Sequence, residues 1–331
     1  MKAQEAKRNV EYNLTWILAG LILSGLLGLA AMSLAAEDAW TKKADMPTPR
    51  WGLSASVVNG KIYIIGGTPD DSFACLSTVE EYDPMTDKWA KKADMPTPRS
   101  LFSASVVNGK IYTIGGTPDG DSGFSTVEEY DPATDTWTTK ADMLIPRWGL
   151  SASVVNGKIY AIGGGGMSDE AVISPVEVYD PVADTWTRKA DMLTLRVLFS
   201  VSVVDGKIYA IGGTDDPRSS FSTVEEYDPA TDTWTKKPDM LIPRFGLCAS
   251  VVDGKIYAIG GTSDSDFVGL SGVEAYDPVS DTWTKKADMP TPRSVFSTSV
   301  VDRKIYAIGG TSDGNSVGLS TVEVYNPAAD N

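Results

Sequence analysis

Hydrophobic and polar positions repeat one short pattern six times between residue 50 and the end of the chain. In the second copy, residues 102–107 partly alternate apolar with polar side chains, and residues 110–114 are mostly apolar. Residues 125–130 form a third β-prone segment, and residues 136–140 form a fourth. Segments of about five residues with this alternation are typical of β-strands. Each copy therefore predicts four strands joined by short connections.

Turn signals lie between these segments and indicate antiparallel pairing. Asn108-Gly109 follows the first segment, and Asn-Gly favours a two-residue hairpin because both turn positions need positive φ. Gly115-Gly116 ends the second segment, and Asp131-Pro-Ala-Thr-Asp135 separates the third from the fourth. The last copy departs from this pattern, with Asp302-Arg303 in the first turn and Asn326-Pro in the second.

Three marker residues recur with steps of 48 or 49 positions along the chain. A tryptophan recurs in the fourth strand, at Trp40, Trp89, Trp137, Trp186, Trp234 and Trp283. An arginine recurs before the first strand, at Arg50, Arg99, Arg147, Arg196, Arg244 and Arg293. A Gly pair after the second strand keeps the same interval. Four strands in a repeat of this length predict the blade of a β-propeller.

The two ends of the repeated region complement each other. The sixth copy stops near Asn331 before a fourth strand, whereas residues 39–45 have a fourth-strand pattern without the three strands that normally precede it. Pairing the N-terminal strand with the last blade would leave no open sheet edge between the ends. We therefore predict an all-β fold over residues 37–331, a six-bladed propeller closed by its N-terminal strand.

The repeat resembles the Kelch family in its Gly pair, in Tyr-Asp-Pro after the third strand and in the tryptophan of the fourth. The resemblance extends over residues 40–331 and implies a Kelch-type propeller, a fold that serves many functions. The family includes galactose oxidase and sialic-acid epimerases. The oxidase reading implies a copper centre with histidine ligands, and this chain contains no histidine, so we expect no such activity.

Residues 1–36 have the composition of an export signal. Lys2, Lys7 and Arg8 precede an uncharged run at 16–36, which is long enough to span a bilayer. The run ends in small residues near Ala35 and Ala36 that resemble a signal-peptidase site. It is either a cleaved signal peptide, giving a secreted or periplasmic protein, or a retained anchor and the chain's only contact with the membrane. Both alternatives predict a propeller outside the cytoplasm.

Charge and composition narrow the possible chemistry. The formal charge of −15 argues against binding the nucleic-acid backbone. The absence of histidine excludes a Ser-His-Asp nucleophile and a histidine-ligated metal. We expect no cofactor and a monomeric propeller. Cys75 and Cys248 fall in blades that are not neighbours, so we expect no disulfide between them.

Variation concentrates on one predicted face of the propeller, which we call the loop face. It carries the start of each first strand and the loop between the second and third strands; the hairpin turns lie on the opposite hairpin face. Aromatic residues outside the recurring positions fall on this loop face. The residue directly after each arginine is a predicted ligand-binding position: Trp51, Trp148 and Phe245 in odd blades, and Ser100, Val197 and Ser294 in even blades.

The loops between the second and third strands are acidic and include Asp70, Asp119 and Asp264. Their carboxylates could bind calcium or a cationic ligand, or could be solvated side chains that pair with arginine. Paired carboxylates could also serve glycosidic acid–base chemistry. We expect the six recurring arginines to be structural, bound to loop carboxylates or carbonyls.

Odd and even blades differ systematically. Odd copies begin Arg-Trp/Phe-Gly-Leu, and even copies begin Arg-Ser/Val-Leu/Val-Phe, so blade pairs repeat every 97 residues. This order predicts approximate three-fold symmetry. The pattern as a whole indicates a non-catalytic binding scaffold for a protein or glycan. The alternatives are a histidine-free carbohydrate-active enzyme, such as an epimerase or lyase, and a structural or assembly protein.

Overall fold

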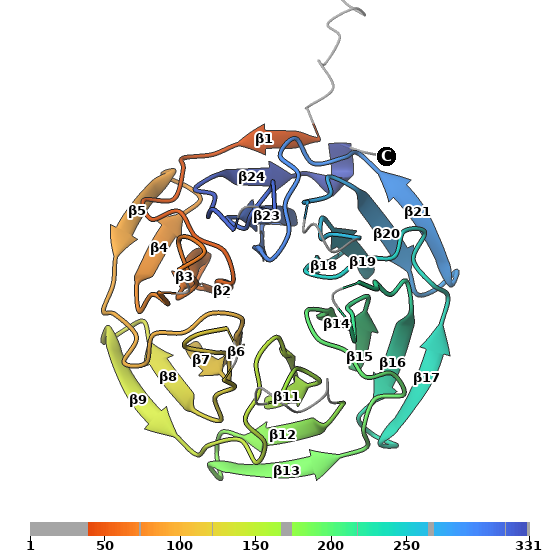
Figure 1. Ribbon diagram of the computed structural model, residues 1–331, viewed down its shortest axis with the longest axis horizontal. Helices are drawn as coiled ribbons and strands as arrows, with labels where there is room; N and C mark the ends of the chain where they lie inside the picture. The colour runs from red at the N-terminus through yellow and green to blue at the C-terminus, as the bar shows by residue number, and fades with distance from the viewer. Residues whose placement is uncertain are drawn as a thin grey trace, which may run out of the picture. The chain divides into compact units, whose positions relative to one another are not determined.

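Each sequence repeat folds into a four-stranded antiparallel sheet, and six such sheets surround a central axis as blades (Figure 1). This computed structural model describes residues 39–72, 74–120, 122–166, 174–216, 218–263, 268–314 and 316–329. The predicted all-β six-bladed propeller is confirmed.

The blades are numbered in chain order, and in each of them the first strand lies nearest the axis. Blade one contains β2 (Ser54–Val58), β3 (Lys61–Ile65), β4 (Val79–Asp83) and β5 (Lys88–Lys91). Blade two contains β6 (Ser103–Val107), β7 (Lys110–Ile114), β8 (Val127–Asp131) and β9 (Thr136–Lys140). Blade three contains β10 (Ser151–Val155), β11 (Lys158–Ile162), β12 (Val176–Asp180) and β13 (Thr185–Lys189). Blade four contains β14 (Ser200–Val204), β15 (Lys207–Ile211), β16 (Val224–Asp228) and β17 (Thr233–Lys237). Blade five contains β18 (Cys248–Val252), β19 (Lys255–Ile259), β20 (Val273–Asp277) and β21 (Thr282–Lys286). Blade six contains β22 (Ser297–Val301), β23 (Lys304–Ile308), β24 (Val322–Tyr325) and β1 (Trp40–Lys42), and a short 3-10 helix, η1 (Pro327–Ala329), follows β24.

The N-terminal strand closes the ring as predicted. Strand β1 pairs antiparallel with β24, and Trp40 lies opposite Tyr325. Further backbone hydrogen bonds extend the pairing at both ends, from Asn326 N to Ala39 O (2.8 Å) and from Lys43 N to Val322 O (3.0 Å). The last blade is therefore built from both ends of the propeller sequence.

The third strand of blade two differs slightly from its prediction. It covers Val127–Asp131, whereas the pattern predicted residues 125–130. The carbonyl of Ser125 accepts from Met143 N (2.9 Å), and that of Thr126 accepts from Gly115 N (3.2 Å) and from Arg99 Nη1 (3.0 Å). The carbonyls of these two residues thus accept hydrogen bonds from outside the regular strand ladder, and the regular strand starts only at Val127.

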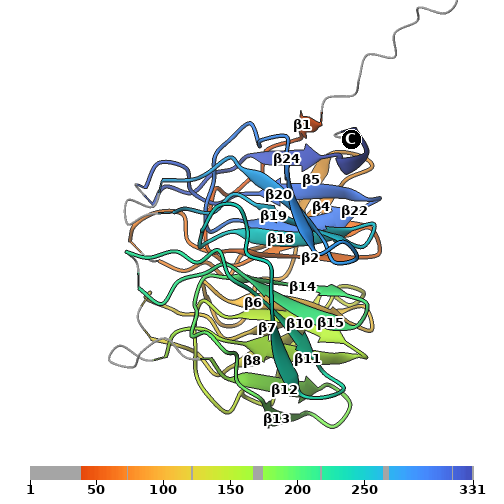
Figure 2. The ribbon, with the colours of Figure 1, turned by 90° about the vertical axis from the view of Figure 1, so that its right-hand side faces the viewer.

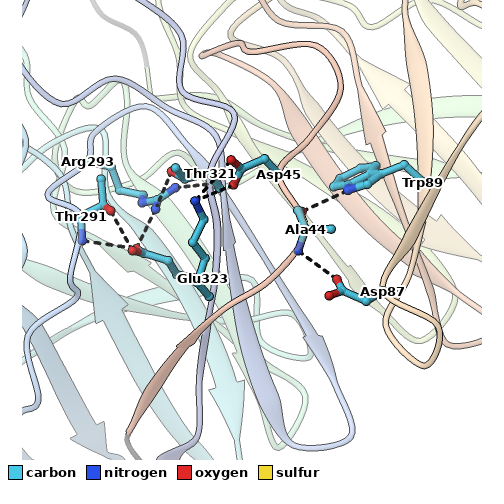
Figure 3. A network of polar contacts seen from close by, with 9 residues as sticks. Ala44, Asp45, Asp87, Trp89, Thr291, Arg293, Thr321 and Glu323 are labelled. Atoms are coloured by element: carbon cyan, nitrogen blue, oxygen red, sulfur yellow. Dashed lines mark hydrogen bonds and ion pairs between the residues drawn. The ribbon is translucent and has the colours of Figure 1, made fainter.

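Adjacent blades are joined by aromatic packing and by polar contacts that repeat around the ring. The Tyr82 ring lies 4.9 Å from Trp89 in its own blade and 6.1 Å from Tyr306 in the neighbouring blade. Figure 3 shows the polar part of one junction: Trp89 Nε1 donates to Ala44 O (3.1 Å), and Ala44 N donates to Asp87 Oδ1 (2.9 Å). The recurring aromatic residues therefore connect blades.

The recurring arginines are fully buried beneath the loop face. Arg99 is representative: Nη1 donates to Gly115 O (2.8 Å), and Nη2 donates to Glu128 Oε2 (2.9 Å). In every blade the carboxylate comes from the third strand rather than from a loop: Glu80, Glu128, Glu177, Glu225, Glu274 and Glu323. The expected carbonyl contacts are present, but the expected loop carboxylates are replaced by strand carboxylates, because the arginine lies below the loops.

The two faces of the propeller separate clearly in the side view (Figure 2). The hairpin turns lie on the right of that view, and the loops between second and third strands extend to the left. No helix in the described ranges is long and apolar enough to cross a membrane. The uncharged run at 16–36 lies outside those ranges.

Candidate binding cup on the loop face

A closed ring of backbone hydrogen bonds surrounds the propeller axis. One residue from each blade donates its N–H to the carbonyl of the residue in the preceding blade, over distances of 2.7–2.9 Å. The ring runs through Gly52, Leu101, Gly149, Leu198, Gly246 and Val295. All six residues have positive φ, between 48° and 63°. The ring thus has glycine in every odd blade and a branched apolar residue in every even blade.

The three apolar members of this ring hold an unfavourable backbone conformation. Leu101, Leu198 and Val295 have φ values of 52°, 53° and 48°, where side chains clash with the backbone and glycine does not. A β-branched residue such as valine is the least suited of all. Strained backbone positions are concentrated at functional sites. The cavities that these three side chains line are therefore candidate binding sites.

A cavity of 460 Å³ lies on the loop-face side of the ring; we call it the axial cup. Its lining includes Trp51, Trp148 and Phe245 from the odd blades and Leu101, Leu198 and Val295 from the even blades, with Val197, Thr311 and the rim residues Asp215 and Asp216. The three predicted aromatic positions are therefore brought together around one cavity, although they lie 97 residues apart in sequence.

The aromatic side chains of the cup are held in place by the surrounding structure. Trp51 is 7% exposed, and its Nε1 donates to Ser316 O at 2.8 Å. Phe245 has no exposed surface, whereas Trp148 is half-buried. Trp148 thus has the most accessible ring of the three, and the other two form a fixed lining. A site with its apolar lining already ordered loses little side-chain entropy on binding.

The even-blade positions after the arginines divide into two kinds. Val197 lines the cup. Ser100 and Ser294 are fully buried and are not among the residues that line it. Ser100 Oγ accepts from Cys75 Sγ at 3.3 Å. Ser294 pairs through its backbone with Thr311, which does line the cup.

Of the three predicted acidic positions, Asp70 and Asp119 are not among the residues that line the cup. Asp70 is exposed, and its Oδ1 accepts from the Ser72 hydroxyl and from Ser72 N (3.0 Å), contacts that lower the pKa of the Asp70 carboxyl. Asp119 is exposed and accepts from Ser122 N at 2.8 Å. Asp264 lies outside the described residues. Within the described ranges, no group of three or more acidic or cysteine side chains is placed to hold a metal ion.

Sequence reasoning predicted Val197 but missed the apolar ring residues Leu101, Leu198 and Val295, and the three aspartates that it selected do not include Asp215 or Asp216. The signal was present in the alternation of Gly52 with Leu101, repeated in the following blade pairs. An apolar residue aligned with a glycine of positive φ indicates a side chain kept at a strained position. Asp215 and Asp216 lie in one of the acidic loops, and the sequence does not show which of these loops reaches the cup.

A second, narrower cavity of 190 Å³ lies on the other side of the ring, along the innermost strands. Leu101, Leu198 and Val295 line both cavities and so form the partition between them. Ser54 and its counterparts line this channel, and each of these serine hydroxyls accepts from the next blade's backbone, as in Ala104 N to Ser54 Oγ (3.1 Å). Cys248 occupies the equivalent position in blade five.

Neither cysteine forms a disulfide, as expected. Burial raises the pKa of the Cys248 thiol to about 12, and its Sγ donates to Phe296 O at 3.0 Å. Burial also raises the pKa of the Cys75 thiol. Both thiols therefore stay protonated at neutral pH and are poor nucleophiles.

Apolar side chains are also exposed on the loop face outside the cup. Among the described residues, Leu144, Leu193 and Leu241 are 59–60% exposed, and each lies in the linker between one blade and the next. The three other linkers carry proline at the corresponding position: Pro47, Pro96 and Pro290. The exposed leucines thus occupy three consecutive junctions, between blades two and five.

Comparisons with known proteins agree with this architecture. The family model described as the KLHDC2/KLHL20/DRC7 Kelch-repeats domain matches residues 31–195 and 148–330. No curated protein sequence matches the chain. The chain is similar to a solved structure titled "Structure of YjhT", with 17% identity, a TM-score of 0.74, and coverage of 85% of this chain and 95% of the other. At this identity the likeness shows the fold alone. The family match spans the whole propeller, and the chain therefore belongs to the Kelch-repeat β-propeller family.

Proposed function

We propose that the protein is a non-catalytic scaffold that binds a protein or glycan ligand at the loop face. The axial cup carries this proposal, because three aromatic side chains from separate blades converge there on one cavity. Its volume of 460 Å³ lies within the range of about 300–1,000 Å³ seen for ligand pockets. Kelch propellers typically act as binding scaffolds, which is consistent with this use.

The strained ring supports the same proposal. Glycine occupies the ring in three blades at no steric cost, so glycine would also be the relaxed choice in the others. Leu101, Leu198 and Val295 instead provide apolar surface to the cup at an energetic cost. A purely structural ring would gain stability by losing these side chains, whereas a binding site needs them.

Capture experiments test the proposal. The purified full chain is screened on glycan and peptide arrays, and Trp148→Ala is compared with the parent. Trp148 is preferable to Trp51, since it is half-buried and its removal disturbs the fold less. We expect saturable capture that Trp148→Ala weakens by at least about tenfold. Equal capture by the variant would refute the cup as the binding site.

Enzymatic turnover is the competing outcome of the same screen. A carbohydrate-active enzyme would convert a captured sugar, and conversion would be lost on replacing one cup carboxylate, such as Asp215→Asn. Binding without turnover supports the scaffold. Turnover that depends on Asp215 or Asp216 would refute the scaffold hypothesis and support the enzyme hypothesis.

We also propose that the propeller acts outside the cytoplasm. The uncharged run at 16–36 and the basic residues before it support export. Strand β1 begins with Trp40 opposite Tyr325, at the hairpin-face end of β24. Intact-mass measurement of the protein from its native membrane and soluble fractions shows whether residues 1–36 are removed. Recovery of the uncleaved chain from the cytosol would contradict this proposal.

A further inference from the structure

We propose that the axial cup binds a bulky apolar side chain flanked by cationic groups, as presented by a basic amphipathic peptide. This inference rests on the proposed function, since it uses the same cup, and it adds the class of ligand. Four features of the cup support it: its apolar lining, one unpartnered hydroxyl, the charge of the surrounding loops and the strain of its apolar ring residues.

The lining fits an apolar group better than a sugar. Most of the residues that line the cup are apolar, including Trp51, Trp148 and the three ring side chains. Two polar groups beside them already have partners: Trp51 Nε1 donates to Ser316 O, and Thr214 Oγ1 donates to Asp216 O. A sugar placed there would leave hydroxyl groups without hydrogen bonds, which is costly in a desolvated site. An apolar side chain has no hydrogen bonds to water to lose when it enters the cup.

One hydroxyl in the cup has no partner in the described part of the chain. Thr311 lines the cup, is 95% buried, and its Oγ1 makes no hydrogen bond with any described residue. An unsatisfied buried hydroxyl costs free energy unless a ligand completes it. A peptide N–H beside the inserted side chain is a suitable donor.

The loops around the cup carry strong negative charge. The six loops between second and third strands contain eleven acidic residues and a single basic one, Arg218. Asp215 and Asp216 are exposed and line the cup rim. Their carboxylates are positioned by Ser219 Oγ (3.0 Å) and by Arg218 N (2.9 Å), respectively. Such a rim attracts cations and repels anions, and the tryptophan faces favour cations as well.

Three pentapeptides with blocked ends serve as probes, each titrated against the full chain by isothermal calorimetry. Gly-Lys-Phe-Lys-Gly carries the proposed ligand chemistry, Gly-Glu-Phe-Glu-Gly reverses its charge, and Gly-Lys-Ser-Lys-Gly removes its apolar group. We expect the first to bind at least about tenfold more tightly than either of the others. Equal binding of the charge-reversed peptide would overturn the cationic requirement, and equal binding of the serine peptide would overturn the apolar one.

Val295→Gly separates binding from folding. The change removes apolar cup surface while relieving the positive φ of Val295, so we expect at least a fivefold loss of affinity with the melting temperature within about 3 °C of the parent. The double variant Asp215→Asn/Asp216→Asn should lower the affinity for the lysine peptide and leave the affinity for a neutral Gly-Ser-Phe-Ser-Gly peptide unchanged. The matched control is Met85→Ala, which alters a 92% exposed apolar side chain on the hairpin face.

The outcomes distinguish this inference from the proposed function. If no lysine peptide binds but a glycan is captured in a Trp148-dependent manner, the scaffold stands and the ligand class proposed here is wrong. If peptides bind but Val295→Gly and Trp148→Ala have no effect, the cup is not the site and both proposals fail. Loss of binding in the Met85→Ala control would likewise contradict the cup.

Discussion

The buried ion pair between the recurring arginine and the third-strand glutamate is the strongest polar feature at the scale of single residues. Arg147 and Glu177 are both fully buried, 3.3 Å apart. Burial lowers the pKa of the Arg147 guanidinium to about 10, which still leaves it charged at neutral pH. Removing one partner of a buried ion pair strongly lowers the stability of the fold, because the remaining charge is neither paired nor solvated.

Removing one arginine should therefore be severe, as blade four can test, and Arg188 in strand β13 of blade three offers a matched control. Arg196 Nη2 donates to Glu225 Oε1 at 2.6 Å, and both side chains are fully buried. We expect Arg196→Met to lower the free energy of unfolding by about 3–5 kcal/mol. Arg188→Met, which breaks an exposed pair with Asp191, should change it by less than about 1 kcal/mol. Urea denaturation of both variants provides the comparison, and equal losses would contradict a buried-pair role.

The last hairpin contains a residue that strains its turn. Arg303 has φ of 61°, where the other five blades have glycine. We expect Arg303→Gly to raise the free energy of unfolding by about 0.5–1 kcal/mol, since the exposed pair with Asp253 contributes little. Gly254→Arg is the reverse change, in a turn with open space around its Cα, and should lower stability by about 1 kcal/mol. Urea midpoints that move in the same direction for both variants would refute the backbone argument.

At the scale of elements, the N-terminal strand β1 decides whether the ring is closed. Trp40 is buried in the core between blades five and six, and its Nε1 donates to Ala287 O at 3.0 Å. Strand β1 also covers the outer edge of β24. Without it, the last blade would expose unpaired backbone groups and the apolar surface around Tyr325.

Deleting the strand should therefore destabilise the whole propeller. We expect removal of residues 1–46 to lower the melting temperature by more than about 5 °C, through the loss of buried tryptophan surface and of backbone pairing. The control lacks only residues 1–38, which lie outside the described residues, and it should melt like the full chain. Differential scanning calorimetry compares the two, and identical melting would show that β1 does not close the ring.

At the scale of the whole molecule, the absence of histidine and the repeated turn aspartates set the pH dependence. Asp87, Asp135, Asp184, Asp232 and Asp281 each accept a tyrosine O–H, and this contact lowers the pKa of each carboxyl. A carboxyl with a lower pKa in the folded state stabilises the fold above its unfolded pKa of about 3.9. That stabilisation is lost as the pH falls through the folded value.

Stability should consequently be flat between pH 6 and 8 and decline below about pH 4. No histidine titrates in the neutral range, and both thiols have raised pKa values. Urea unfolding at a series of pH values measures the profile. Asp184→Asn should reduce the acid dependence, because it removes one of the shifted carboxyls. A steep change between pH 6 and 8 would contradict this account.

The approximate three-fold symmetry of blade pairs is also a property of the whole molecule. Odd blades supply Trp51, Trp148 and Phe245 to the cup, and even blades supply the apolar side chains of the ring. The alternation was visible as a 97-residue period, but its result, one aromatic-lined cavity on the axis, needs all six blades. The cup therefore exists only in the closed propeller.

The sequence alone determined the strands, the turns, the number of blades and the closure, because these depend on local alternation, on Asn-Gly or Asp-Gly turns and on a period repeated six times. It also placed Trp51, Trp148 and Phe245 on one face. Only the tertiary structure decided which side chains meet at the axis. It showed that the buried arginines bind strand glutamates rather than loop acids, and that Asp215 and Asp216 line the cup whereas Asp70 and Asp119 do not. Local pattern specifies which face a residue occupies, whereas distances across the axis depend on how six blades pack together.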